Sequence, residues 1–493
     1  MKGRKRALVA LALLAGLLLS CAALARPGSG ESFSGGSSPS GGGGGDGGEG
    51  LGVLLELLLW LCIEHPSVGI PLTLLVLVGL VVRAALQRGL KAWSSGKVDV
   101  ARVQKVERRA PSARRELEAL REVDPELSVV LFEDFAYMLY GAVQRARGVG
   151  TGWLAAYLDP TFQSRLQQPE LADVQGIVIG ALRYVRVRRG AQVEVELALE
   201  ANYVEVSRSG AQQRWYVVDR LTLARSASAR SRPFARAHKL DCPNCGAPLE
   251  ALRGTECSYC QQSVGLGRFD WMVTSLINRT REPRGPLLTK DVPETGTDKP
   301  TIIDAGAQAA FTQLAARDPS LSWQSFTHRI AHVFAELQVA WAGRDPLRIR
   351  PYVSDNLFQS LYYWIDLYVQ ARCRNVTEGA RILRIDLARV SSDKHYDSIT
   401  VRVFATSTDY VISDDGKVLR GSRSRQRSYS EYWTWIRGSE RKGATRGDLS
   451  CPNCGAPLRV GMSGSCEYCR VKVTAGEFDW VLSRIEQDDS YSG

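Results

Sequence analysis

Two cysteine quartets with the same spacing constrain the fold of this 493-residue chain more than any other feature. Each reads C-P-N-C-G-A-P-L and continues to a second C-x2-C pair, so the full pattern is C-x2-C-x11-C-x2-C. A Phe-Asp-Trp tripeptide follows each quartet (Phe269–Trp271 and Phe478–Trp480). The repeated pattern predicts two metal sites in an internally duplicated chain. The eight cysteines are Cys242, Cys245, Cys257, Cys260, Cys451, Cys454, Cys466 and Cys469.

The spacing of each quartet is typical of structural zinc. Two residues between paired cysteines allow both thiolates to face one ion at about 2.3 Å, and a second pair completes a closed tetrahedron. A closed shell leaves no position for water or substrate, so we expect two structural Zn²⁺ ions and no hydrolytic centre. The alternative is two disulfides per quartet in an oxidising compartment. Of the three other cysteines, a buried Cys373 is most simply a small apolar residue.

The N-terminus has the pattern of a signal peptide. Residues 1–25 contain a basic start, an uncharged run from Ala7 to Leu19, and the small-residue site Ala23-Leu24-Ala25. The sequence Leu18-Leu19-Ser20-Cys21 is similar to a bacterial lipobox, so lipidation of Cys21 remains open. Residues 26–50 are mostly Gly and Ser, which predicts a flexible spacer.

Residues 51–90 contain two apolar stretches. The first, Leu51 to Ile63, is short and carries Glu56, so we expect an interfacial helix, although a second crossing is the alternative. The second, Ile70 to Leu86, is long enough to cross a bilayer with slight extension. Lys and Arg residues crowd the following stretch, and positive residues beside a span stay in the cytoplasm. We therefore expect a single-pass bacterial inner-membrane protein whose domains after Arg83 are cytoplasmic.

The basic juxtamembrane segment, residues 91–115, is expected to lie against anionic lipid head groups. The net charge of +11 also permits a nucleic-acid partner. We do not expect one, because the first quartet has only Arg253 near its cysteines, while the second has Arg459, Arg470 and Lys472.

The remaining chain repeats one order of elements. Val123-Asp-Pro-Glu-Leu-Ser128 matches Arg317-Asp-Pro-Ser-Leu-Ser322, and each is followed by a helical pattern. Alternating apolar residues at 193–199 and 399–405 then predict half-buried antiparallel strands. The fold class is therefore α+β. We expect a first domain at 116–280 with a zinc ribbon at 242–260, a linker at 281–310, and a second domain at 311–488 with a ribbon at 451–469.

The second domain resembles a known family. Phe334-Ala-Glu-Leu-Gln-Val-Ala-Trp341, Glu431-Tyr-Trp-Thr-Trp-Ile-Arg437 and the closing Phe478–Ile485 segment are similar to the Tim44-like domain, which is named for a subunit of the mitochondrial import machinery at the inner membrane. The resemblance implies two cone domains similar to nuclear transport factor 2, each a curved antiparallel sheet backed by helices around a hydrophobic pocket. The first copy departs from the pattern, with Leu221 and Leu223 in place of both tryptophans. The zinc ribbons depart from the mitochondrial pattern and are interpreted as insertions.

No set of residues predicts catalysis. His328 and His332 have i, i+4 spacing on a helix, but Arg329 stands where a metalloprotease motif requires Glu, and we expect both to face solvent. The aromatic residues Trp341, Tyr362, Tyr363, Trp364, Trp433 and Trp435 are expected to be mostly core, with the remainder able to line a pocket for an apolar ligand. We therefore expect a non-enzymatic, membrane-anchored binding or scaffold protein for an unidentified protein or lipid. The alternative is an enzyme or small-ligand sensor that uses the second cone's pocket, through a residue such as Asp366.

Overall fold

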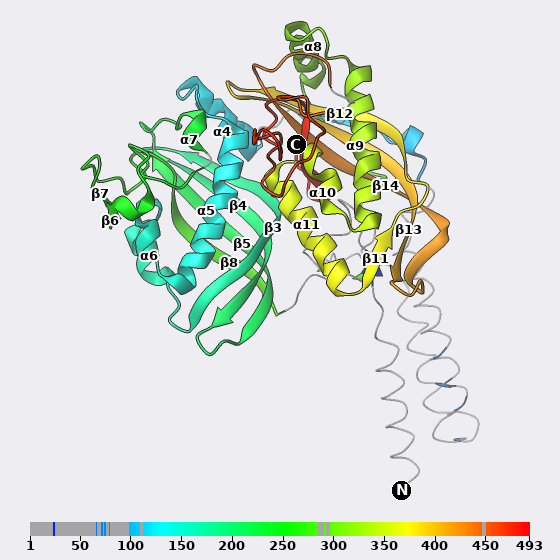
Figure 1. The fold of residues 1–493 in the computed structure, drawn as a ribbon, viewed down its shortest axis with the longest axis horizontal. Helices are drawn as coiled ribbons and strands as arrows, with labels where there is room; N and C mark the ends of the chain where they lie inside the picture. The colour runs from blue at the N-terminus through cyan, green and yellow to red at the C-terminus, as the bar shows by residue number, and fades with distance from the viewer. Residues whose placement is uncertain are drawn as a thin grey trace.

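The computed structural model describes residues 98–108, 112–237, 239–283, 296–445 and 450–493, together with a few isolated positions before residue 98 and at 290–291. Apart from those isolated positions, the expected signal peptide, spacer and two apolar helices lie outside the described residues. Among the helices that the structure describes, none is both long enough and apolar enough to cross a membrane. The described chain contains helices and curved antiparallel sheets, arranged as two units side by side (Figure 1).

The first unit packs α5 across a four-stranded antiparallel sheet with the strand order β3-β4-β5-β8. Helix α5 begins after Ser128, whose hydroxyl caps the helix by accepting from the Leu131 N–H, and it ends at Gly150, which has a φ of 99°. The elements are α4 (Ala113–Glu118), η2 (Ala119–Glu122), α5 (Val129–Val149), η3 (Gly152–Tyr157), α6 (Pro160–Leu166), β3 (Leu171–Arg189), β4 (Gln192–Ser207), β5 (Gln212–Ser226), α7 (Phe234–Ala237), η4 (Leu249–Ala251), β6 (Leu252–Arg253), β7 (Glu256–Cys257) and β8 (Met272–Glu282).

The second unit has the same plan, with a fifth strand in its sheet. Its sheet has the order β11-β13-β14-β15, and β12 pairs with the other half of β13. Helix α9 begins in a capping box between Ser322 and Ser325. The elements are α8 (Ala307–Arg317), α9 (Trp323–Gly343), α10 (Pro346–Ile349), η5 (Arg350–Tyr352), α11 (Asp355–Gln370), β11 (Cys373–Val376), β12 (Arg381–Ser392), β13 (Tyr396–Ser413), β14 (Val418–Gly438) and β15 (Val481–Gln487).

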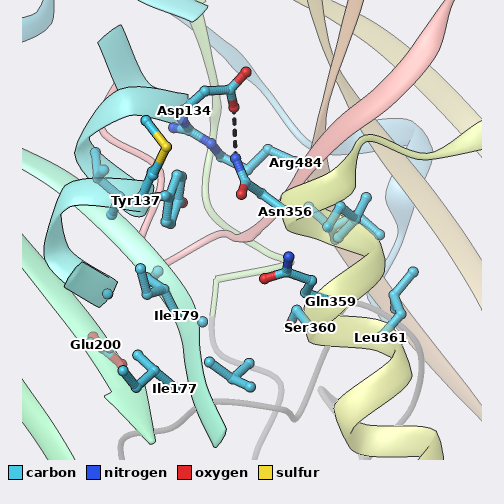
Figure 2. Close-up of a pocket in the computed structure, with 18 of the residues that line it drawn as sticks. Asp134, Tyr137, Ile177, Ile179, Glu200, Asn356, Gln359, Ser360, Leu361 and Arg484 are labelled. Carbon is cyan, nitrogen blue, oxygen red and sulfur yellow. Dashed lines mark hydrogen bonds between the residues drawn. The ribbon is translucent and has the colours of Figure 1, made fainter. Parts of the chain in front are cut away.

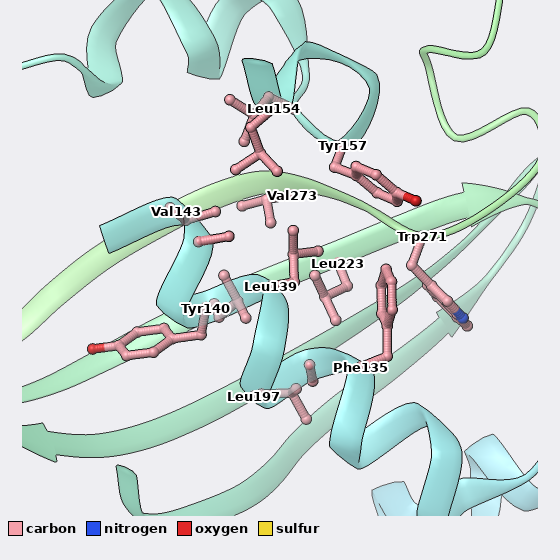
Figure 3. Close-up of a cluster of buried hydrophobic side chains, with 14 of the residues drawn as sticks. Phe135, Leu139, Tyr140, Val143, Leu154, Tyr157, Leu197, Leu223, Trp271 and Val273 are labelled. Atoms are coloured by element: carbon pink, nitrogen blue, oxygen red, sulfur yellow. The ribbon is translucent and has the colours of Figure 1, made fainter. Parts of the chain in front are cut away.

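Hydrophobic burial holds each unit together. In the first unit, side chains of α5 and η3 meet the inner face of the sheet, and Figure 3 shows Phe135 and Leu139 of α5 beside Leu223 and Trp271. Burying a side chain of this size stabilises a fold by about 1.5–3 kcal/mol. In the second unit, tryptophan side chains fill the space between the helices and the inner face of the sheet. Trp341, Trp364, Trp433, Trp435 and Trp480 are all buried in one cluster, as expected for most of this aromatic set, whereas Tyr362 is exposed.

The two units share details of sheet geometry. The last two strands of each sheet have a register irregularity at the same place, Thr222/Leu223 in the first and Thr434/Trp435 in the second. An isolated parallel bridge joins the loop before a helix to the closing strand in both, Leu158 to Val273 and Val353 to Leu482. Leu221 and Leu223 therefore occupy the places of Trp433 and Trp435. Each Phe-Asp-Trp tripeptide ends just before the closing strand begins.

A short parallel ribbon covers the outer side of the second sheet. Strand β2 (Lys105–Arg108) comes from the segment expected to be a basic juxtamembrane stretch, and β10 (Thr301–Asp304) comes from the expected linker. The buried Arg402 holds this ribbon by donating to the carbonyls of Gly296 and Lys299, both at 2.8 Å, and it pairs with Asp488 at 2.9 Å. Part of both connecting segments is thus built into the second unit.

Candidate metal centres and the cleft between the units

Each cysteine quartet forms one compact cluster of sulfurs. In each group the four Sγ atoms lie within 4.8 Å of one another. The distance is 3.9 Å between Cys242 and Cys260, 3.8 Å between Cys245 and Cys257, and 3.7 Å between Cys451 and Cys469. A tetrahedral site with metal–sulfur bonds of about 2.3 Å has sulfur–sulfur edges of about 3.8 Å, whereas a disulfide bond is about 2.05 Å long. The sulfurs therefore fit a four-thiolate metal site, and both expected groups of site residues are brought together.

An asparagine in each quartet supports the thiolate form of one cysteine, whereas burial raises the pKa of Cys242 in the first quartet. The side-chain amide of Asn244 is hydrogen-bonded to Cys260 and lowers the pKa of that thiol to about 6, and Asn453 does the same for Cys469. A lowered pKa favours the deprotonated sulfur, which is the form that binds a metal. Sequence analysis assigned this asparagine no role at the metal, although its repetition at the same place in both quartets was an available signal.

The first quartet is fixed to the core of its unit. Cys242 and Cys257 are fully buried, and the Tyr157 hydroxyl donates to the Asp241 carbonyl at 2.6 Å. The Asp241 carboxylate in turn accepts from Arg232 at 2.8 Å. Cys245, by contrast, is exposed. The quartet therefore faces solvent at Cys245 and is attached to η3 through Tyr157 on its other side.

Both quartets lie in the connection that precedes the closing strand of their sheet. The first is between β5 and β8, and the second is between β14 and β15. A closed four-thiolate site supplies no open coordination position, so its chemistry is structural. A metal ion held there would fix a long loop and with it the start of the closing strand.

A cleft of about 720 Å³ separates the two units (Figure 2). Asp134 and Tyr137 of α5 and Ile177 and Ile179 of β3 face it from the first unit. The second unit contributes the first half of α11, including Asn356 and Leu361, and strand β15 with Arg484. Sequence analysis did not predict this cleft, because its walls come from segments more than two hundred residues apart.

Asp134 is the titratable group that stands out in the cleft. The Asn356 amide donates to its carboxylate at 2.6 Å across the junction between the units. Burial raises the pKa of Asp134 to about 7, helped by the negative charges of Glu133 and Asp355 and opposed by Arg484 and Lys472. Asp134 therefore changes charge near neutral pH. Sequence analysis assigned no role to this residue.

A buried ionic cluster beside the cleft connects the units. Glu133 of α5 accepts from Arg484 of β15 and from the Tyr184 hydroxyl at 2.9 Å, and Arg114 lies 3.6 Å away. Burial alone would raise the pKa of Glu133, but the charges of Arg484 and Arg114 lower it below its ordinary value. The carboxylate thus stays ionised and bridges guanidinium groups from both units.

The other residues considered from the sequence lie apart from these features. His328 is exposed as expected, but His332 is half-buried against Tyr352, with ring centroids 5.2 Å apart. His332 thus keeps part of its surface in solvent while its ring packs on Tyr352. Asp366 is half-buried on α11, where its carboxylate accepts from Gln370 at 2.6 Å. Cys373 is buried in the apolar core, as expected.

Comparison with known proteins identifies one domain. Residues 307–445 match the family model of the Tim44-like domain, a segment that runs from α8 to just beyond the end of β14. The search of curated proteins found no match. The second unit is therefore similar to the Tim44-like domain over this segment, and the match ends before the second cysteine quartet.

Proposed function

We propose that this Tim44-like domain protein is a non-enzymatic scaffold, anchored in the bacterial inner membrane by one helix, that presents two units to the cytoplasm for protein or lipid partners. The observation that carries the proposal is the Tim44-like match in a unit whose inner side is filled by tryptophans. A filled core favours binding at the outer surfaces over catalysis in a pocket. The basic segment at 91–115 and the apolar stretch before it support the membrane anchor.

We also propose that the two units are copies of one cone fold similar to nuclear transport factor 2, each with an inserted zinc ribbon. The matching strand order, register irregularity and parallel bridge support the duplication. A buried aspartate–arginine pair at equivalent positions adds to it: Asp124 with Arg225 at 2.7 Å, and Asp318 with Arg437 at 2.9 Å. Zn²⁺ is the metal that four thiolates with this spacing most favour.

The test is photo-crosslinking in native membranes. A photoreactive residue at Ile177, in the cleft, should capture specific proteins or lipids, whereas the same residue at Arg253, on the first ribbon, serves as the matched surface position. Recovery of the same nonspecific background from both positions would contradict the scaffold. A separate experiment tests the orientation. Protease added to intact spheroplasts should spare the chain beyond Arg83, and cleavage there would reverse the proposed orientation.

The cleft favours one other candidate, a small-ligand sensor. Its volume lies in the range of pockets for small molecules, and Asp134 offers a titratable group. The sensor expected from the sequence would use the pocket inside the second unit, whereas this candidate would use the cleft between the two units. Native mass spectrometry of the purified full chain would reveal a co-purifying small molecule, and its absence together with protein crosslinks at Ile177 would favour the scaffold.

A further inference from the structure

The wall that β3 contributes to the cleft is the edge of a sheet. Every residue from Asp173 to Arg183 lines the cavity. Successive side chains of a strand point to opposite faces, so a wall that one face supplied would include only alternate residues. Register irregularities at Gln175/Val178 and Ile179/Ala181 break the alternation in this stretch, and the wall of consecutive residues includes the backbone of the strand. In β15, likewise, all residues from Ser483 to Gln487 line the cavity.

Both strands are outermost in their sheets. Within the described chain, β3 pairs with β4 alone, and β15 pairs with β14 and, through Leu482, with Val353. An unpaired edge presents alternate N–H and C=O groups that can pair with another strand. A bulge at Gly176 and Ile177 interrupts the β3–β4 ladder at the cleft, and bulges of this kind redirect side chains at binding sites.

The charges around the cleft favour a basic occupant. Five carboxylates line it, but only three guanidinium groups do. Arg183 pairs with Glu200, and Arg484 pairs with Glu133 outside the lining and lies 3.7 Å from Glu486, so the lining as a whole has two more carboxylates than guanidiniums. The lining carboxylates are Asp134, Asp173, Glu200, Glu486 and Asp489. Apolar side chains such as Ile177, Ile179 and Leu361 lie between the charges.

We propose that the cleft binds an extended segment of a partner protein, which adds as a strand to the edge of β3 and places a Lys or Arg side chain against Asp134. Backbone hydrogen bonds to the edge would supply affinity, and the carboxylates and isoleucines would select basic and β-branched side chains. The inference rests on the proposed scaffold function and specifies the chemistry of its partner.

The experiment selects peptides from a random phage-displayed 12-mer library on the full chain, purified in detergent with its metal. Enriched peptides should alternate Lys or Arg with Val, Ile or Thr. For a synthetic peptide of the best sequence, N-methylation of one set of alternate residues should weaken binding about tenfold or more, because it removes the donors that face β3, while N-methylation of the other set should not. Hydrogen exchange of residues 173–183 should slow on binding.

The protein variant Asp134→Asn should weaken binding of the same peptide about tenfold, because a desolvated charge pair is lost. Glu467→Gln, on the second ribbon, is the control and should change nothing. No enriched peptides, equal tolerance of both methylation patterns, or full affinity of the Asp134→Asn protein would each overturn the inference. If crosslinks at Ile177 still capture proteins or lipids in membranes after such a result, the scaffold function stands and only the strand-addition inference fails.

Discussion

At the scale of single residues, the two units share a buried ion pair beneath a tryptophan. Arg225 lies over the Trp271 ring and Arg437 over the Trp480 ring, both at 4.6 Å. Asp318, the partner of Arg437, also accepts from the backbone N–H groups of Ser320 and Gly443, which explains why a carboxylate can be buried there.

Replacing Asp318 with Ala should destabilise the second unit by about 3–5 kcal/mol, because Arg437 would remain buried without its counter-ion. Urea denaturation followed by tryptophan fluorescence measures the change. The double variant Asp318→Leu with Arg437→Met should regain much of the loss, since replacing a whole buried pair by apolar groups is often neutral. Equal stability of the wild type and Asp318→Ala would show that the pair contributes nothing.

Asp134 predicts a pH dependence of stability. Its pKa is about 7 in the folded chain against an ordinary value of 3.8, so between these values the folded state keeps a proton that the unfolded state has lost. The contribution of this carboxyl to stability therefore falls as the pH rises from about 4 to 7. Asp134→Asn should raise the free energy of unfolding by about 1–2 kcal/mol at pH 8 and leave it unchanged near pH 4. Thermal denaturation at both pH values checks the sign; a larger gain at pH 4 would contradict it.

At the scale of elements, capping serines and the periodicity of hydrophobic residues set where the helices lie in the sequence. The alternation of apolar and polar residues sets where the strands lie. The loop that carries each cysteine quartet leads directly into the last strand of its sheet. Strand β8 pairs only with β5 among the described strands, and β15 has β14 as its strand neighbour, so each depends on the loop that delivers it.

Metal loss should therefore act on one unit at a time. The variant Cys257→Ser should lower the bound zinc from two ions to one per chain and accelerate hydrogen exchange in β8, with little change in β15. Cys466→Ser should likewise leave one zinc ion per chain, and it should accelerate hydrogen exchange in β15 with little change in β8. Losing a structural zinc site costs several kcal/mol of folding free energy. Elemental analysis and exchange mass spectrometry measure both effects, and two zinc ions retained in either variant would exclude the four-thiolate sites.

At the scale of the whole molecule, the two units form a junction with both apolar and ionic contacts. Leu131 of α5 packs with Ile436 and Val481 of the second sheet, and Glu126 lies 3.2 Å from His395. Glu133 and Arg484 form the buried centre of the junction.

Glu133→Ala should destabilise the chain by about 3 kcal/mol and loosen the junction, because Arg484 and Arg114 would lose their shared carboxylate. Urea denaturation measures the stability, and crosslinking between cysteines placed at Met138 and Gln359 measures the width of the cleft. The control Glu194→Ala removes a more exposed pair with Arg188 and should change stability by less than about 1 kcal/mol. If Glu133→Ala and Glu194→Ala lowered the free energy of unfolding by similar amounts, a special role for Glu133 would be contradicted.

The sequence by itself determined the features that depend on local spacing. Cysteine spacing predicted the two sulfur clusters, apolar periodicity predicted a helix after each Asp-Pro segment, and alternation predicted the strands from Val193 and Ile399. These features depend on interactions between residues close in the chain, so the pattern of residues is sufficient to predict them.

Only the tertiary structure decided which distant segments meet. The pairing of β2 with β10, the ionic bridge from Glu133 to Arg484, and the cleft between β3 and α11 each join parts of the chain that no local pattern connects. Asp134 acquires its raised pKa from burial at that junction and from Glu133 and Asp355 nearby, and the sequence around it carries no sign of this. Long-range packing sets both the position and the charge of the groups in the cleft, because desolvation depends on what the folded chain places around them.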